Sequence, residues 1–106
     1  MPYFLVLLQP VAGGGPDPPE HEPFTDSLLA RNLILLGGGL DLPLAGADAA
    51  YVLACGSLPE AREIVAGDPL VTSGSRRAEV VEWELVGINP EALDAELVLR
   101  PGDVAG

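Results

Sequence analysis

The only histidine of the chain, His21, carries the side chain best suited to acid–base chemistry. Imidazole gains and loses a proton near neutral pH, which general acid and base catalysis requires. A neighbouring carboxylate fixes the ring tautomer and favours the protonated form, and Asp68, at the predicted end of a helix, is the candidate. Both residues also fit ordinary structural roles. A histidine beside proline and glutamate can be a packed or solvated loop residue, and aspartate before proline is a common turn former.

Other residues with reactive side chains give weaker signals. Ser73 and Ser75, in TSGSRR, follow Asp68 closely and are possible ligand-binding residues. Cys55 is the only cysteine, so it has no thiol partner for a disulfide or a Cys/His zinc site, and we expect a small buried residue. The glycines at 13–15 lack the spacing of phosphate-binding loops and predict a flexible loop. We therefore expect no metal and no cofactor.

Charge and length exclude several classes of protein. Five arginines, no lysine and 16 acidic residues give a net charge of -11, which repels nucleic acids and anionic membrane surfaces. The longest apolar stretches, such as residues 3–8 and 33–36, are far shorter than the roughly 20 residues that cross a bilayer. The N-terminus shows no basic region or cleavage site of a secretory signal. We expect a single domain in the cytoplasm.

The first half of the chain predicts a strand, a helix and two more strands. Residues 3–8, YFLVLL, are apolar on both alternating faces and predict a strand buried on both sides. Helical spacing of apolar residues predicts a helix over residues 20–32. Residues 33–36 and 50–55 predict the next two strands, and we expect DLPLAGADA between them to be a loop. The glycines that follow position 36 are expected to end the second strand.

The second half predicts one helix and one strand. Ser57 followed three residues later by Glu60 is a capping box, which marks the start of a second helix. We expect that helix to end at Gly67, in the left-handed conformation that glycine tolerates. Residues 79–86, EVVEWELV, alternate apolar and acidic side chains and predict the last strand.

This order of elements, βαββαβ, is typical of the ferredoxin-like α+β fold, in which two helices cover one face of a four-stranded antiparallel sheet. We expect residues 1–88 to form that domain and residues 89–106 to form a C-terminal tail, whose role as an added strand or as an arm that crosses to a partner stays open. The first three strands are apolar on both faces, so the uncovered face would expose a large hydrophobic patch. We therefore expect a homodimer.

The same topology predicts that His21 and Asp68 meet. The first helix starts beyond the carboxyl end of the first strand, and the antiparallel third strand sends the second helix back towards that edge. His21 stands three residues before Phe24, on the side of its helix that turns towards the sheet, and Asp68 follows the last turn of the second helix. We expect the two side chains to share a cleft.

Two segments carry a resemblance to a known family. HEPFTDSLLARNLILLGG and SLPEAREIVAGDPLVTSG, the latter followed by AEVVEWEL, resemble the YciI-like (YCII-related) proteins over most of residues 3–86. The resemblance implies a dimeric α+β barrel and a catalytic His/Asp dyad, which falls on His21 and Asp68. The chain departs from the family pattern at Pro18, where an arginine is common. It also has Gly38 and Gly39 where Gly-Pro is common.

Taken together, the residues and the resemblance predict a small-molecule enzyme. We expect a lyase or isomerase that needs no cofactor and acts on a small organic compound, such as a cyclic or aromatic one, by proton transfer at His21 with Asp68 orienting the ring. The alternative is a non-catalytic dimeric module that binds a small ligand or serves as an accessory. Expected partners are a second copy of the chain and a small molecule, with no nucleic acid and no membrane.

Overall fold

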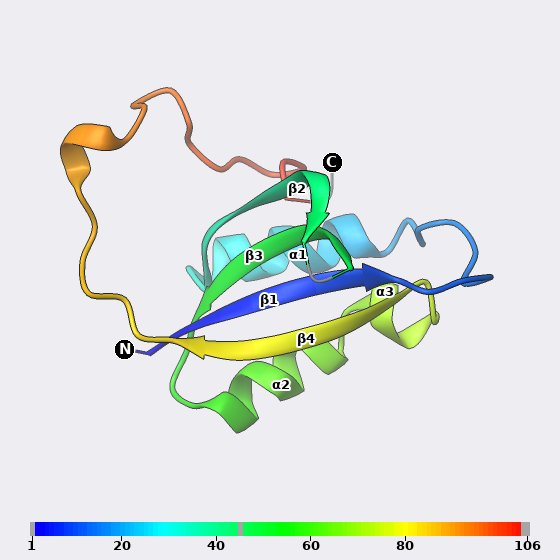
Figure 1. The fold of residues 1–106 in the computed structure, drawn as a ribbon. Coiled ribbons are helices and arrows are strands. Elements are labelled where there is room, and N and C mark those ends of the chain that lie inside the picture. The colour runs from blue at the N-terminus through cyan, green and yellow to red at the C-terminus, as the bar shows by residue number, and fades with distance from the viewer. Residues whose placement is uncertain (1, 45, 105–106) are drawn as a thin grey trace.

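The computed structural model describes residues 2–44 and 46–104, except for the side chains of 42–44, and shows a layer of helices packed against one sheet (Figure 1). Its elements are, in chain order, β1 (Tyr3–Pro10), α1 (His21–Ala30), β2 (Ile34–Leu44), β3 (Ala47–Ala54), α2 (Leu58–Ala66), α3 (Pro69–Thr72), β4 (Arg76–Trp83) and the 3-10 helix η1 (Pro90–Ala92). No helix of the described residues is long and apolar enough to cross a membrane.

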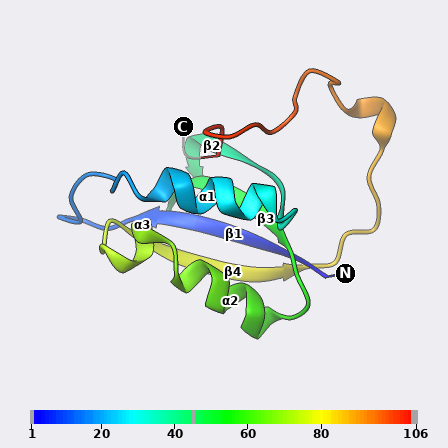
Figure 2. The ribbon, with the colours of Figure 1, turned by 180° about the vertical axis from the view of Figure 1, so that it is seen from behind.

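The sheet confirms the predicted fold. Its strands lie in the order β2-β3-β1-β4, and each neighbouring pair is antiparallel. The helices cover one face only, as the view from behind shows (Figure 2). This is the ferredoxin-like βαββαβ arrangement, with the short helix α3 inserted between α2 and β4.

The hydrophobic core fills the space between the sheet and the helices. Alternate residues of β1 point into it, and Phe4 and Val6 are fully buried there. Leu28 of α1 and Val65 of α2 close the core from the helix side. Burial of each such side chain contributes about 1.5–3 kcal/mol to stability, so this layer fixes where α1 and α2 sit on the sheet.

The second strand is longer than the sequence indicates. The expectation that the glycines at 37–39 end it is wrong, because β2 continues to Leu44 and pairs with β3 through Gly37, Gly38 and Gly39. The segment DLPLAGADA is therefore mostly strand rather than loop, although residue 45 lies outside the described residues. Pairing with β3 supplies backbone hydrogen bonds that compensate for the low strand preference of glycine.

The connection from α2 to β4 also differs from the prediction. Gly67 ends α2 as expected but with φ -85, so the predicted left-handed conformation is wrong. The chain turns directly into α3, with Pro69 in its first turn. The last strand is β4, which begins at Arg76 and ends at Trp83, three residues earlier at each end than the predicted 79–86. The Ser57 cap is present, since its hydroxyl accepts the Glu60 N–H at 3.2 Å.

The sheet face away from the helices keeps apolar side chains exposed. Leu36, Val81 and Trp83 are 53%, 46% and 46% exposed. The strand register places Val81 beside Leu5, and Trp83 beside Tyr3, on this open face. In the single chain, this surface has no helical cover.

The C-terminal tail leaves the sheet after β4 and returns to the side of α1 and β2 (Figures 1 and 2). There the Gly102 N–H donates to the Asp26 carboxylate at 2.7 Å, and Leu99 and Val104 pack against the core. Residues 95–100 form no strand in this chain. Between β4 and this docking point, aliphatic side chains such as Leu97, 83% exposed, have little cover.

Candidate active site

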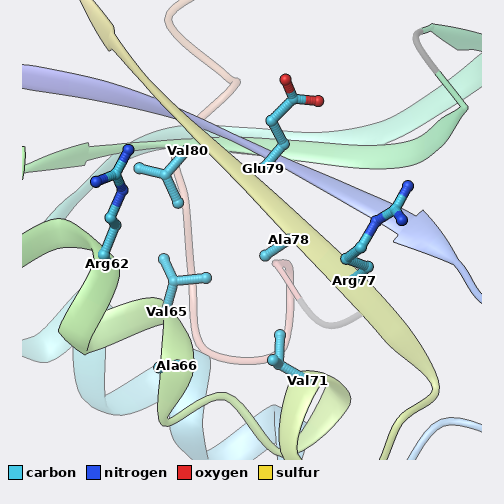
Figure 3. A pocket seen from close by; sticks show the side chains of 8 residues that line it. All are labelled: Arg62, Val65, Ala66, Val71, Arg77, Ala78, Glu79 and Val80. Atoms are coloured by element: carbon cyan, nitrogen blue, oxygen red, sulfur yellow. The ribbon is translucent and has the colours of Figure 1, made fainter.

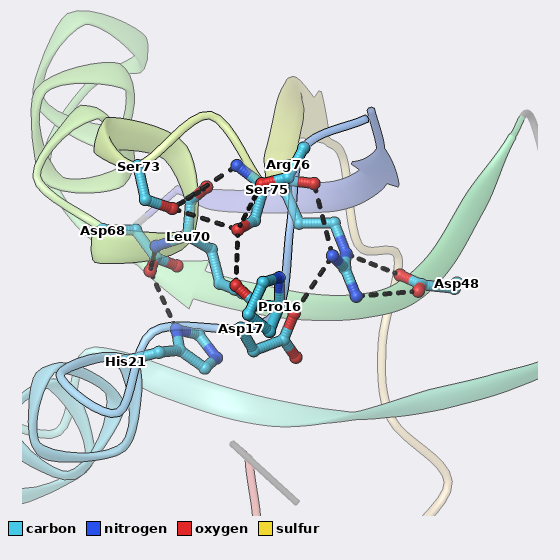
Figure 4. A network of polar contacts seen from close by, with 10 residues as sticks. Pro16, Asp17, His21, Asp48, Asp68, Leu70, Ser73, Ser75 and Arg76 are labelled. Carbon is cyan, nitrogen blue, oxygen red and sulfur yellow. Dashed lines mark hydrogen bonds and ion pairs between the residues drawn. The ribbon is translucent and has the colours of Figure 1, made fainter. Parts of the chain in front are cut away.

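His21 is the first residue of α1, and its ring faces α3 (Figure 4). Its backbone N–H donates to the Pro18 carbonyl at 3.1 Å, which ties the start of the helix to the preceding loop. His21, Thr25 and Leu28 form the buried stripe of α1, at the spacing of one helix face. Because that face packs on the core, His21 is only 5% exposed.

Asp68 lies between α2 and α3 and caps α3. Its backbone is extended, as expected for a residue before proline, and its Oδ1 accepts the Leu70 N–H at 2.9 Å. The same oxygen lies 2.8 Å from His21 Nδ1, and the Asp68 side chain is fully buried. The structure therefore brings together the two predicted residues, which are 47 positions apart in the sequence.

This geometry fixes the chemistry available to the ring. When Asp68 is ionised it can only accept a hydrogen bond, so His21 Nδ1 carries the proton and Nε2 of the neutral ring is a proton acceptor. Within the described part of the chain Nε2 has no hydrogen-bond partner, and 7% of the His21 side chain is exposed. A proton taken up at Nε2 would create an imidazolium whose charge Asp68 balances.

The two serines support the loop that leads into α1. The Ser75 hydroxyl lies 3.3 Å from the Gly14 carbonyl and 3.0 Å from the Pro16 carbonyl, and Ser75 is buried. Ser73 donates its hydroxyl to that of Ser75 at 3.1 Å. These bonds join the turn before β4 to the loop before His21. A ligand-binding role for Ser73 and Ser75 stays a prediction.

An ion-pair network not foreseen in the sequence lies beside this loop. Arg76 pairs with Asp17 at 3.1 Å and, through two nitrogens, with Asp48 at 3.1 and 3.3 Å (Figure 4). The two acidic partners come from the loop before α1 and from β3. No local pattern connects them in the sequence, because only the folded sheet brings β3 and β4 to either side of β1.

Comparisons with known proteins find a solved structure with limited similarity and a related uncharacterised protein. No protein-family model matches the chain. A solved structure of 5-chloro-2-hydroxyhydroquinone dehydrochlorinase (TftG) from Burkholderia phenoliruptrix AC1100, in complex with 2,5-dihydroxybenzoquinone, is similar with a TM-score of 0.46 and 17% identity. The similarity covers 77% of this chain and 93% of that one.

The sequence relationship is stronger. The uncharacterised protein YjpA of Bacillus subtilis (strain 168) is 40% identical over 65 residues, which are 61% of this chain and 73% of YjpA. The chain belongs to the YjpA family. Because YjpA is uncharacterised, membership of its family alone assigns no reaction to the His21–Asp68 pair.

Tyr51 is a further polar residue of the YjpA-family chain, on the helix-facing side of β3. It lies in the strand predicted over residues 50–55, and the structure buries it to 1% exposure within the core cluster. Burial and, to a smaller extent, the negative charge of Asp68 raise the pKa of the Tyr51 hydroxyl well above its usual range. A strand pattern alone cannot show that Asp68 is near enough to act on it.

Three hollows of this YjpA-family chain lie away from the His21–Asp68 pair. One of about 510 Å³ lies between α2, α3 and β4, and Arg62 and Arg77 stand at its rim (Figure 3). Another of about 810 Å³ separates β2 from the tail, and a third of about 190 Å³ lies on the open sheet face beside Trp83. Neither His21 nor Asp68 lines any of these three hollows.

Proposed function

We propose that this protein is an acid–base enzyme in which His21 transfers a proton at Nε2 and Asp68 orients and charge-balances the ring. The observation that carries the proposal is the 2.8 Å contact between His21 Nδ1 and Asp68 Oδ1 in a buried setting. A buried carboxylate is retained at a cost in desolvation. The cost is consistent with a functional role, and the resemblance to YciI-like proteins points to the same pair.

The reaction class follows from what the pair can do. After His21 removes a proton, an isomerase returns it to another atom of the substrate, whereas a lyase releases a leaving group as a double bond forms, and neither reaction needs a cofactor. We propose a small organic substrate, because His21 is only 5% exposed and its ring is accessible only to a small molecule. A cyclic or aromatic compound with an acidic proton suits a single base of this kind.

A non-catalytic ligand-binding module is the second candidate, favoured by the positions of the hollows. The hollows on the open sheet face and beneath the tail lie apart from His21. A ligand held there would use the fold as a scaffold, and the His21–Asp68 contact would then serve stability alone. The two candidates differ in whether a bound compound is converted in a reaction that requires the imidazole.

A thermal-shift screen with small acidic and phenolic compounds separates the candidates, because a ligand of the native state raises the melting temperature. Compounds that bind are then tested for turnover with the wild type, His21→Gln and, as a control, Asp41→Asn, which removes one exposed charge. The enzyme proposal expects a loss of about 10²- to 10⁴-fold in His21→Gln and none in the control. Binding without turnover, equal in all three proteins, would support the module.

We also propose that the protein is a homodimer formed through the open sheet face. Trp83 and Val81 on this face are each 46% exposed, which is unusual for large apolar side chains clustered on one surface. The exposed aliphatic residues of the tail, Val86, Ile88 and Leu97 among them, would gain cover if the tail crossed to the partner. Two copies would thereby bury surfaces that one copy leaves in water.

A further inference from the structure

Two buried polar atoms close to the candidate site lack hydrogen-bond partners in the described structure. They are the hydroxyl oxygen of Tyr51 and Oδ2 of Asp68, both inaccessible to solvent. The other carboxylate oxygen of Asp68 has two donors, the Leu70 N–H and His21 Nδ1. Buried polar groups nearly always have a partner, so two such atoms in one region call for a common explanation.

Tyr51 and Leu70, a close neighbour of Asp68 in the chain, belong to one core cluster. Tyr51 points from β3 to the helix side of the sheet, where it shares the core cluster with Leu70, two residues after Asp68. The charge of Asp68 contributes to raising the pKa of Tyr51, which supports their proximity. Gly37 stands opposite Tyr51 in β2, and a Cβ built there would lie 2.8 Å from Tyr51 Cβ. The absence of a side chain at position 37 thus leaves room for the tyrosine.

We propose that the Tyr51 hydroxyl and Asp68 Oδ2 together bind one internal water molecule, and that Tyr51 thereby acts as a positioning residue for the His21–Asp68 pair. The water accepts a hydrogen bond from Tyr51 and donates one to Oδ2. This satisfies both orphan groups, because an unionised hydroxyl donates and a carboxylate accepts. A polar site with two or more partners is the kind that retains buried water.

The consequence for the pair concerns the orientation of the carboxylate. With Oδ2 held by the water, Oδ1 stays turned towards His21 Nδ1 and the Leu70 N–H. The positioning role rests on the proposed acid–base function, whereas the water site stands independently of it. An experiment can therefore contradict the positioning role of Tyr51 without contradicting the water site.

A high-resolution crystal structure of the full chain tests the water site directly. We expect an ordered water about 2.8 Å from both the Tyr51 hydroxyl and Asp68 Oδ2. In Tyr51→Phe, which keeps the ring and removes the hydroxyl, the water is expected to be lost. Tyr3→Phe, at the other tyrosine, is the matched control and should retain it. A direct Tyr51–Asp68 hydrogen bond, or no water between them in the wild type, would overturn the proposal.

The positioning role is tested by proton NMR of the His21 Nδ1–H, whose exchange with solvent reports how firmly Asp68 holds it. We expect exchange to accelerate by about tenfold or more in Tyr51→Phe and to stay unchanged in Tyr3→Phe, a factor that matches one hydrogen bond to a charged group. Equal exchange in all three proteins would refute the positioning role. Loss of turnover in His21→Gln decides the proposed function separately from either result.

Discussion

At the scale of single residues, the site depends on the starts of α1 and α3, which lie at the same edge of the sheet. His21 opens α1 and Asp68 caps α3, so each is held by backbone hydrogen bonds before the two side chains meet. The sequence predicts this meeting, because the fold order determines which helix ends are neighbours. It does not predict that the charge of Asp68 acts on the buried Tyr51 hydroxyl, since that depends on how β3 and α3 pack in the core.

The buried hydroxyl of Tyr51 predicts a loss of stability in alkali. The pKa of Tyr51 is higher in the native state than in the unfolded chain, where it is about 10. The hydroxyl therefore contributes its full stabilisation below about pH 10, and this contribution is lost as the pH rises above that value. Between about pH 9 and about pH 11 we expect the free energy of unfolding to fall more in the wild type than in Tyr51→Phe, with a slope difference of up to ~1.4 kcal/mol per pH unit. Urea unfolding of both proteins measures it, and parallel pH profiles would show that Tyr51 ionises freely.

At the scale of elements, pairing between strands overrides local preference. Three successive glycines suggest the end of a strand, yet β2 runs through them because β3 pairs with each of the three. The helix α3 was not predicted either, because its four residues are too few for a periodic pattern and follow directly after its N-cap Asp68. The capping box of α2 was predictable because its signal is local, between Ser57 and the Glu60 N–H.

Gly37 and Gly38 offer a matched test of this packing. A Cβ at Gly37 would come within 2.8 Å of Tyr51 Cβ, whereas a Cβ at Gly38 would meet nothing within 4 Å. We expect Gly37→Ala to lower the free energy of unfolding by about 1–3 kcal/mol through overpacking, and Gly38→Ala to leave it unchanged or slightly higher. Chemical denaturation of the wild type and the two variants measures these changes in the free energy of unfolding. Equal stability would mean that the β2–β3 pair adjusts freely around Tyr51.

At the scale of the whole molecule, charge and hydrophobic surface have opposite effects on association with a second copy of the chain. A net charge of -11 disfavours association with another copy, and burial of the open face favours it. The sequence indicates the apolar face, because residues on both sides of the first three strands are hydrophobic. The path of the tail could not be predicted from the sequence, because the Gly102–Asp26 hydrogen bond and the packing of Leu99 on the core join distant parts of the chain.

The dimer proposal predicts a specific effect of charge on the open face. We expect the wild type to sediment as a dimer at micromolar concentration, with a contact on the order of 2,000 Å² or more in total. Val81→Arg should yield monomers, because it places a charge in the buried contact. Ala66→Arg, at an exposed residue of α2 on the other side of the sheet, is the control and should remain dimeric. A wild type that sediments as a stable monomer would contradict the dimer.

The most direct test of the central claim is nitrogen-15 NMR of His21, whose signal is unambiguous because the chain has no other histidine. Recorded on the neutral ring, the spectrum is predicted to show a protonated Nδ1, held by Asp68, and an unprotonated Nε2 available as a base. Asp68→Asn should shift the tautomer balance, because a carboxamide no longer supplies the charged acceptor. A ring protonated at Nε2 in the wild type, or an identical spectrum in Asp68→Asn, would contradict the assignment of this pair as the acid–base centre.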